Sequence, residues 1–231
     1  MPNASHRNAL ALLAATSSID DASHGKARTA RLALNAWGVA ALCGLAVIAL
    51  SPAALAASLL ENGGNAVLSG KIELGDDDSF ARFLARPRSI PIKYLKLNSD
   101  GGRVSVAAEI ALDVRRAGIS TIVDASTSRC ESACTLIFAG GVRRFYLNAH
   151  SVVDGIGPGM GIAFHRGNDL NVTGMGKQED TSVTQRMIST FQSMGMPAAK
   201  QFVMKAGVED LYRISAKSAL ESRVATSLTA P

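Results

Sequence analysis

Short β-like and α-like patterns alternate along this chain, and the alternation restricts the folds open to it. The apolar run Ile92–Leu97 has the length of a buried strand, and it ends in Asn98-Ser99-Asp100-Gly101-Gly102. Apolar residues then recur at helical spacing over Val104–Ala117, and the β-branched run Ile119–Val123 predicts the next strand. Strands that alternate with single helices pair in parallel through crossover connections. The pattern therefore predicts an α/β fold.

The remaining elements follow from the same two periodicities. Further strands are predicted over residues 66–74, 143–147, 162–165 and 211–214. Further helices are predicted over residues 79–85, 131–139, 181–194, 198–206 and 215–221. The glycine-rich segment Gly155–Gly161 is interpreted either as a lid over a cleft or as a flexible insertion. The polar segment Gly167–Gly176 is expected to be mobile.

Residues 1–57 have the composition of an export signal. A polar, basic region precedes the apolar core Ala36–Leu50, and Ala54-Leu55-Ala56 matches a cleavage site, with cleavage after Ala56 or Ala57. If uncleaved, the uncharged run 32–60 exceeds the roughly 20 residues that span a bilayer, and it would form a transmembrane anchor. Both alternatives predict a periplasmic or otherwise extracytoplasmic protein. Residues 58–65 are then a predicted linker, and 66–231 a single domain.

Charge and cysteine content limit the classes of partner. Beyond Ser58 lie 20 of the 24 Lys and Arg residues and 17 of the 19 Asp and Glu residues, and the two signs are interspersed. No basic cluster with interleaved aromatic residues is present, so nucleic-acid binding is not expected. The three cysteines form no C-x-x-C pair, and there is no His-rich cluster. Neither a metal site nor a cofactor is therefore predicted.

Three distant segments carry the groups that acyl transfer needs, namely a nucleophile, a base and donors for an oxyanion. Ser132 lies where a loop meets the predicted helix 131–139, so the N–H of Ala133 would be one oxyanion donor. Gly101 and Gly102 would supply the second, because a residue without a Cβ lets its amide approach a ligand closely. These groups predict an oxyanion hole beside Ser132.

The base would be a histidine or a lysine. The predicted exported part contains His150, in a polar turn, and His165, at the end of an apolar strand, and His165 is the favoured candidate. Each feature also has an ordinary structural explanation, since a serine at a helix start is often an N-cap and a histidine at a strand end is often only hydrogen-bonded. No G-x-S-x-G motif is present. The combination predicts a serine-hydrolase-type site, and a peptidase in particular.

The order of these motifs resembles the Clp protease proteolytic-subunit/crotonase superfamily. The similar features are the strand–Asn-Ser-Asp-Gly-Gly–helix unit, Ser132-Ala133 entering an apolar helix, Arg144-Phe145, and the strand that ends in His165. With Cys-x-Ser-Ala-Cys around the serine, the chain is similar to exported bacterial members. The resemblance spans about Val67–Thr226. It implies a spiral of ββα units, a peptide or protein substrate, Ser132 as nucleophile, His165 as base, Gly102 and Ala133 as oxyanion donors, and a homo-oligomer.

Two features of this site stay open at the level of sequence. The resemblance indicates Asp210 as the third triad member, while Asp169 and Asp180 remain alternatives. Cys130 and Cys134 lie one helical turn apart, and in an oxidising compartment a disulfide between them would pin the loop that presents Ser132. The alternatives are two buried free thiols, or a reactive Cys134 that makes the protein a cysteine hydrolase.

Three functions are compatible with these residues. The leading one is an exported serine peptidase that acts on peptides or membrane-protein fragments. The second is a catalytically inactive binding or assembly module with the same fold. The third is an acyl-CoA hydratase or isomerase, which export disfavours because CoA is cytoplasmic.

Overall fold

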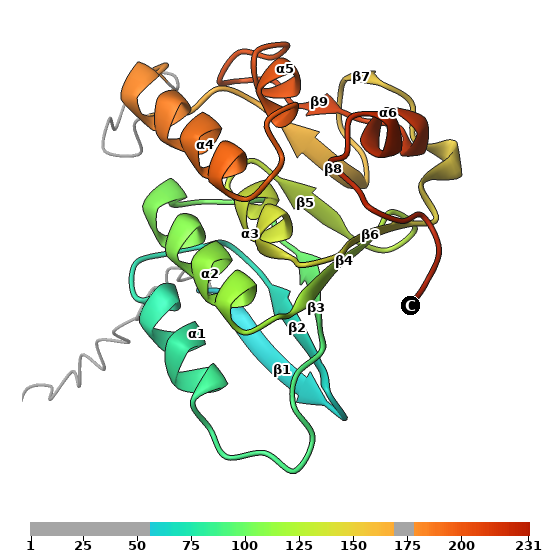
Figure 1. Ribbon diagram of the computed structural model, residues 1–231. Coiled ribbons are helices and arrows are strands. Elements are labelled where there is room, and N and C mark those ends of the chain that lie inside the picture. The colour runs from blue at the N-terminus through green and yellow to red at the C-terminus, as the bar shows by residue number, and fades with distance from the viewer. Residues whose placement is uncertain (1–55, 169–177) are drawn as a thin grey trace, which may run out of the picture. The chain divides into compact units, whose positions relative to one another are not determined.

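Two β-sheets form the framework of the protein in a computed structural model that describes residues 56–168 and 178–231 (Figure 1). The first sheet has the strand order β1-β2-β3-β4-β6, with bounds Ser58–Asn62, Asn65–Ser69, Tyr94–Asn98, Ser120–Asp124 and Arg144–Leu147. The second has the order β5-β8-β9-β7, with bounds Arg129–Glu131, Gly161–Phe164, Tyr212–Arg213 and Gly155–Ile156. Strands β2, β3, β4 and β6 pair in parallel, as the alternating pattern predicts.

Helices connect and cover these strands. In chain order they are α1 (Asp76–Leu84), α2 (Val104–Arg116), α3 (Cys134–Gly140), the short 3₁₀ turn Ala149–Ser151, α4 (Thr181–Ser193), α5 (Ala199–Val203) and α6 (Ala216–Glu221). Helix α2 packs against α1, α3 and α4, and Figure 1 shows α1, α2 and α3 side by side along the first sheet. The sequence prediction of an α/β fold is confirmed.

The core lies between α2, α3 and the first sheet. Helix α2 buries five apolar residues at helical spacing, which are Val106, Ala107, Ile110, Ala111 and Val114. Helix α3 is buried along its whole length. It approaches α2 closely at Gly140, where a Cβ would lie 2.5 Å from the carbonyl oxygen of Ala111. This contact sets how closely the C-terminal end of α3 packs against α2.

The linker prediction for residues 58–65 is wrong. Ser58–Asn62 forms β1, which pairs antiparallel with β2 through the two-residue loop Gly63-Gly64. Both glycines have positive φ, 55° and 81°, which suits the tight turn that joins two right-twisted strands. The exposed edge strand has no apolar alternation, so its sequence looked like a linker. The Asn-Gly-Gly-Asn turn was the signal that could have identified the hairpin.

The interpretation of Gly155–Gly161 as a lid or a flexible insertion is also wrong. Gly155–Ile156 is strand β7, which pairs antiparallel with β9 at the edge of the second sheet. The guanidinium of Arg213 donates from Nε to the carbonyl of Gly157 at 3.0 Å and from one terminal nitrogen to that of Met160 at 3.4 Å. The glycine-rich segment is thus held against the sheet by a side chain of β9.

Two predictions fall largely on residues that the structure does not describe. The signal or anchor segment lies almost wholly within residues 1–55, and most of the segment 167–176 lies within 169–177. Within the two described ranges, no helix combines the length and the apolarity that a bilayer span requires.

Candidate active site

Ser132 lies in a sharp turn between strand β5 and helix α3. Its φ of 52° falls in the left-handed region that residues with a Cβ seldom adopt. Its N–H donates to the carbonyl of Ala163 at 3.0 Å, and its own carbonyl accepts from the N–H of Thr135 at 3.0 Å and from the Thr135 hydroxyl at 2.6 Å. These bonds hold the backbone on both sides of the serine, so its half-buried side chain projects from a fixed turn.

The predicted helix start at residue 131 is wrong, because Glu131 is the last residue of β5 and the helix begins only at Cys134. The serine is therefore presented by a strand–turn–helix unit and is no helix N-cap. Nucleophilic serines of α/β-hydrolases are presented on strained strand-to-helix turns of this kind. No G-x-S-x-G motif marks this turn in the sequence, because Cys130 and Cys134 stand where that motif has glycines.

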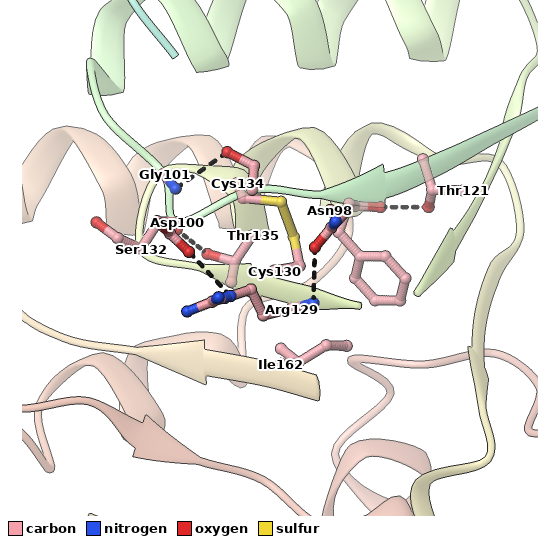
Figure 2. The surroundings of a disulfide bond; sticks show 12 residues. Asn98, Asp100, Gly101, Thr121, Arg129, Cys130, Ser132, Cys134, Thr135 and Ile162 are labelled. Atoms are coloured by element: carbon pink, nitrogen blue, oxygen red, sulfur yellow. Dashed lines mark hydrogen bonds and ion pairs between the residues drawn. A yellow bond between two sulfur atoms is a disulfide. The ribbon is translucent and has the colours of Figure 1, made fainter. Parts of the chain in front are cut away.

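A disulfide between Cys130 and Cys134 brackets this turn (Figure 2). Both cysteines are fully buried, and their Cα atoms lie 5.2 Å apart. The disulfide links the residue two positions before Ser132 to the residue two positions after it. Of the sequence-based alternatives, the structure has the disulfide, and it leaves Cys134 without the thiol that a cysteine hydrolase needs.

Gly101 packs directly against the serine turn. Its φ is 91°, and a Cβ there would lie 2.8 Å from the Cβ of Ser132 and 2.6 Å from the carbonyl oxygen of Glu131. Its N–H donates to the hydroxyl of Ser99 at 3.1 Å. Gly101 therefore permits the close approach of the two segments, while its amide is already used and is not free to bind an oxyanion.

Among the described residues, the hydrogen bonds around Gly102 are made by its neighbours and not by its own amide. Ile72 donates to the carbonyl of Gly101 at 2.8 Å and accepts from the N–H of Arg103 at 2.9 Å, so these two bonds flank Gly102. A Cβ on Gly102 would lie 2.1 Å from the carbonyl oxygen of Ile72. Within the described part of the chain, neither the N–H of Gly102 nor that of Ala133 donates a hydrogen bond. These two amides are available as donors: Gly102 lines the same cleft as Ser132, and Ala133 directly follows this serine.

His165 directly follows strand β8 and is 7% exposed. The parallel register of β5 with β8 pairs Glu131 with Ala163, so Ser132 and His165 lie at the same end of this strand pair. The Nδ1 atom of His165 lies 2.5 Å from the carbonyl oxygen of Arg166. A carbonyl oxygen only accepts, so Nδ1 carries a proton, and the lone pair of the neutral ring is on Nε2. His150, the other candidate, is exposed in the 3₁₀ turn after β6.

The structure distinguishes the three acids considered for the triad. Asp210 is exposed just before β9, and the β8–β9 register continued past the strand ends places it opposite Arg166. No hydrogen bond or ion pair joins its carboxylate to any other described residue. Asp180 caps helix α4 by accepting from the N–H groups of Ser182 and Val183 at 2.7 and 3.2 Å. The hydroxyl of Ser182 is the main cause that lowers the pKa of Asp180. Asp169 lies outside the described residues.

An open cleft of about 260 Å³ lies beside the serine. The lining residues that bear on its chemistry are Gly102, Arg103, Ser132, Asn168, Asp180 and Arg186. The two arginines were not predicted. Arg103 follows the glycine pair directly and could have been inferred from that position, whereas Arg186 reaches the cleft only because α4 packs against α2. In residues 56–168 and 178–231, no group of three or more His, Cys, Asp or Glu side chains is placed to hold a metal ion.

Comparison with known proteins identifies the fold. No family model and no curated protein matches the chain. Two solved structures of variants of the 1510-N membrane-bound stomatin-specific protease are 18% identical to it, with TM-scores of 0.51 and 0.50. They cover 71% of this chain and 77% and 73% of their own, and the second is in complex with a substrate peptide.

An enoyl-CoA hydratase/isomerase from Marinobacter aquaeolei is 10% identical, with a TM-score of 0.47, and covers 76% of this chain and 70% of its own. At 18% identity, the likeness to the two protease structures is one of fold, and a fold does not by itself determine a function. The described part of this chain has the ClpP/crotonase-like α/β fold.

Proposed function

We propose that this protein is an exported serine peptidase in which Ser132 is the nucleophile and His165 the general base. The observation that carries the proposal is a pair of available amides, that of Gly102, which lines the cleft with Ser132, and that of Ala133, which directly follows this serine in its strained turn. Donors prearranged in this way stabilise the oxyanion of a tetrahedral intermediate, and one donor is typically worth about 3–4 kcal/mol. The fold shared with a protease that binds a peptide supports a peptide as substrate.

The reaction would proceed in two steps. In the first, Nε2 of His165 takes the proton of the Ser132 hydroxyl while Oγ attacks the peptide carbonyl carbon, and the oxygen that becomes negative binds the two amides. The protonated imidazole then gives its proton to the leaving amine, so the C–N bond breaks and an acyl-enzyme remains. In the second, a water molecule, activated by the same imidazole, hydrolyses the ester and releases the acid.

Two groups are candidates for orienting the imidazole of His165, namely the Arg166 carbonyl and the Asp210 carboxylate. The Arg166 carbonyl holds Nδ1 and selects the required tautomer without adding a charge. Asp210 remains the candidate third triad member, to be recruited when a peptide is bound. A fall of about 10⁴ in turnover for Asp210→Asn would match the loss of the acid in a Ser-His-Asp triad. An unchanged rate would assign the orienting role to the Arg166 carbonyl alone.

Labelling by a fluorophosphonate tests the nucleophile. We expect the intact protein to gain one phosphonyl group on the peptide that contains Ser132, detected by mass spectrometry. Ser132→Ala should abolish labelling, and His165→Gln should slow it strongly because the hydroxyl then lacks its base. Ser105→Ala is the matched control, since this serine lines the same cleft and plays no part in the mechanism. It should label at the normal rate.

Two outcomes would contradict the proposal. Labelling that survives Ser132→Ala would place the nucleophile elsewhere. Folded protein that never labels would support the second candidate, an inactive binding or assembly module of the same fold. The exposed Asp210 carboxylate, which makes no hydrogen bond or ion pair with another described residue, is the observation that favours this alternative. Export and homo-oligomer formation remain predictions, which fractionation of cells and the solution mass of the protein would test.

A further inference from the structure

Two guanidinium groups line the cleft beside Ser132. Arg186 is exposed on α4, and its side chain makes no hydrogen bond or ion pair with any residue in the described ranges. Arg103 lies between Gly102 and α2, and its Nε atom is buried without a hydrogen-bond partner. The nearest carboxylate, that of Glu73, is 3.7 Å from this Nε and is shared with the ammonium of Lys71 at 2.8 Å. The positive charge of neither guanidinium is therefore fully balanced by a carboxylate.

The acidic side chains near the cleft form no ion pair with Arg186 in the described part of the chain. Asp180 lines the cleft, but one of its oxygens accepts three hydrogen bonds, from the backbone of Ser182 and Val183 and from the Ser182 hydroxyl. Asp77, Asp78 and Glu109 border a neighbouring hollow that Arg186 also lines, and none of the three is within ion-pair distance of it. Both guanidiniums thus keep donors for an incoming anion.

The first turn of α2 adds to the positive electrostatic potential in the cleft. Val104 and Ser105 line the cleft, and this turn has no acidic residue and no side-chain cap. The start of a helix carries a partial positive charge and unused N–H groups. A peptide bound at Ser132 would therefore meet two arginines and the positive end of a 13-residue helix. A planar guanidinium suits a carboxylate because it can donate two parallel hydrogen bonds.

We propose that the cleft selects peptides through a carboxylate that binds Arg186 and Arg103. The carboxylate is either an Asp or Glu side chain close to the scissile bond or the C-terminal carboxylate of the peptide. This inference rests on the proposed function in one respect, since it takes the chain at Ser132 to be a peptide. Charge-assisted hydrogen bonds of this kind are each worth about tenfold or more in affinity.

Binding to the full-length Ser132→Ala variant tests the inference separately from catalysis. The probes are fluorescein-labelled alanine-rich decapeptides that carry one Glu at each position in turn, their Gln counterparts, and both sets with an amidated C-terminus. We expect at least one Glu peptide, or the free-acid form, to bind about tenfold or more tightly than its neutral counterpart in fluorescence anisotropy. A loss on Glu→Gln replacement assigns the side chain, and a loss on amidation assigns the C-terminus.

The arginines are tested in the same assay. Adding Arg186→Gln or Arg103→Gln to the Ser132→Ala protein should bring the acidic peptide to the affinity of the neutral one, and Arg186→Lys should restore part of the difference. Arg116→Gln is the matched control, because Arg116 is on the last turn of α2 and its side chain is 69% exposed. It should leave the preference unchanged. Equal binding of all acidic and neutral peptides would overturn the inference, while fluorophosphonate labelling decides the proposed function independently.

Discussion

At the scale of single residues, the backbone of Ser132 is what separates this serine from the others in the described ranges. Its N–H is bound by Ala163 and its carbonyl by Thr135, so the left-handed φ of 52° is imposed from both sides. The neighbouring Gly101 leaves room for the Ser132 Cβ, since its own Cβ would lie only 2.8 Å from it. A residue with a Cβ is held here at a cost of roughly 1–2 kcal/mol. Such cost is typical of functional sites.

Replacement of Ser132 by Gly and by Ala measures this strain. Glycine adopts positive φ without a steric penalty, so Ser132→Gly should be more stable than Ser132→Ala by about 1 kcal/mol in urea unfolding. Both variants should fail to label. The control is the exposed Ser189 within α4, where the order reverses because glycine is the poorer helix former by about 1 kcal/mol. Equal stabilities at position 132 would show that the turn is unstrained.

The disulfide acts on the same turn. A bridge that closes the five-residue loop 130–134 stabilises the folded state by about 2 kcal/mol in the chain-entropy model. We expect the free energy of unfolding of the natural protein to fall by this amount when a reductant is present. The Cys130→Ala/Cys134→Ala variant should have the lower stability with or without reductant, and it should label more slowly because its serine is less well positioned. Unchanged stability and labelling would contradict a role for the bridge.

At the scale of elements, the second sheet depends on one side chain. Its strands β5, β7, β8 and β9 have only two to four residues each, too few for a stable sheet through backbone pairing alone. Arg213 of β9 donates to Glu131 of β5 at 2.6 Å and to the carbonyls of Gly157 and Met160 beyond β7. It therefore joins three segments, one of which leads directly into Ser132.

Removal of one partner from this buried pair should be costly. Both side chains are 8% exposed, and an uncompensated buried charge typically destabilises a protein by about 3–5 kcal/mol. We expect Glu131→Gln and Arg213→Gln to show losses of this order in urea unfolding. Glu221→Gln is the control, since its pair with Lys217 is exposed and spans 4.0 Å. It should change stability by about 0.5 kcal/mol or less. Similar small losses at all three sites would contradict the assigned role.

At the scale of the whole molecule, Tyr146 couples the two sheets. It belongs to β6 of the first sheet, and its buried hydroxyl accepts from the N–H of Ile162 in β8 at 3.2 Å and donates to the carbonyl of Ile214 at 3.1 Å. Gly161 permits this contact, because a Cβ there would lie 2.2 Å from the hydroxyl oxygen. Burial raises the pKa of Tyr146 to about 12.

Tyr146→Phe should therefore destabilise the fold in a pH-dependent manner. At pH 7 it leaves a buried N–H and a buried carbonyl without their partner, at a cost of about 1–3 kcal/mol. As pH rises from about 10, the value for an exposed tyrosine, towards 12, the unfolded tyrosine ionises while the folded one stays protonated, so the natural protein loses stability that the variant does not. The difference in stability between the natural protein and Tyr146→Phe should therefore narrow over this pH range. A stability difference that does not change with pH would contradict this prediction.

Local sequence rules were sufficient for much of the fold and for the identity of the groups at the site. The helical spacing over Val104–Ala117 predicted α2, because one face of a helix must be apolar to be buried. The Gly101-Gly102 pair was recognised from its place after a strand, although only Gly102 keeps a free amide. The β1–β2 hairpin was missed because its edge strand buries little and carries no alternating pattern.

The sequence by itself determined which chemical groups this protein possesses and roughly where its helices lie, because propensity and periodicity act over a few residues. Only the tertiary structure decided how those groups are used. The strained turn at Ser132, the carbonyl that holds His165, the buried Glu131–Arg213 pair and the arginine of α4 in the cleft all depend on segments far apart in the chain. Such contacts form only when the two sheets and the helices pack together, and no short stretch of sequence encodes that packing.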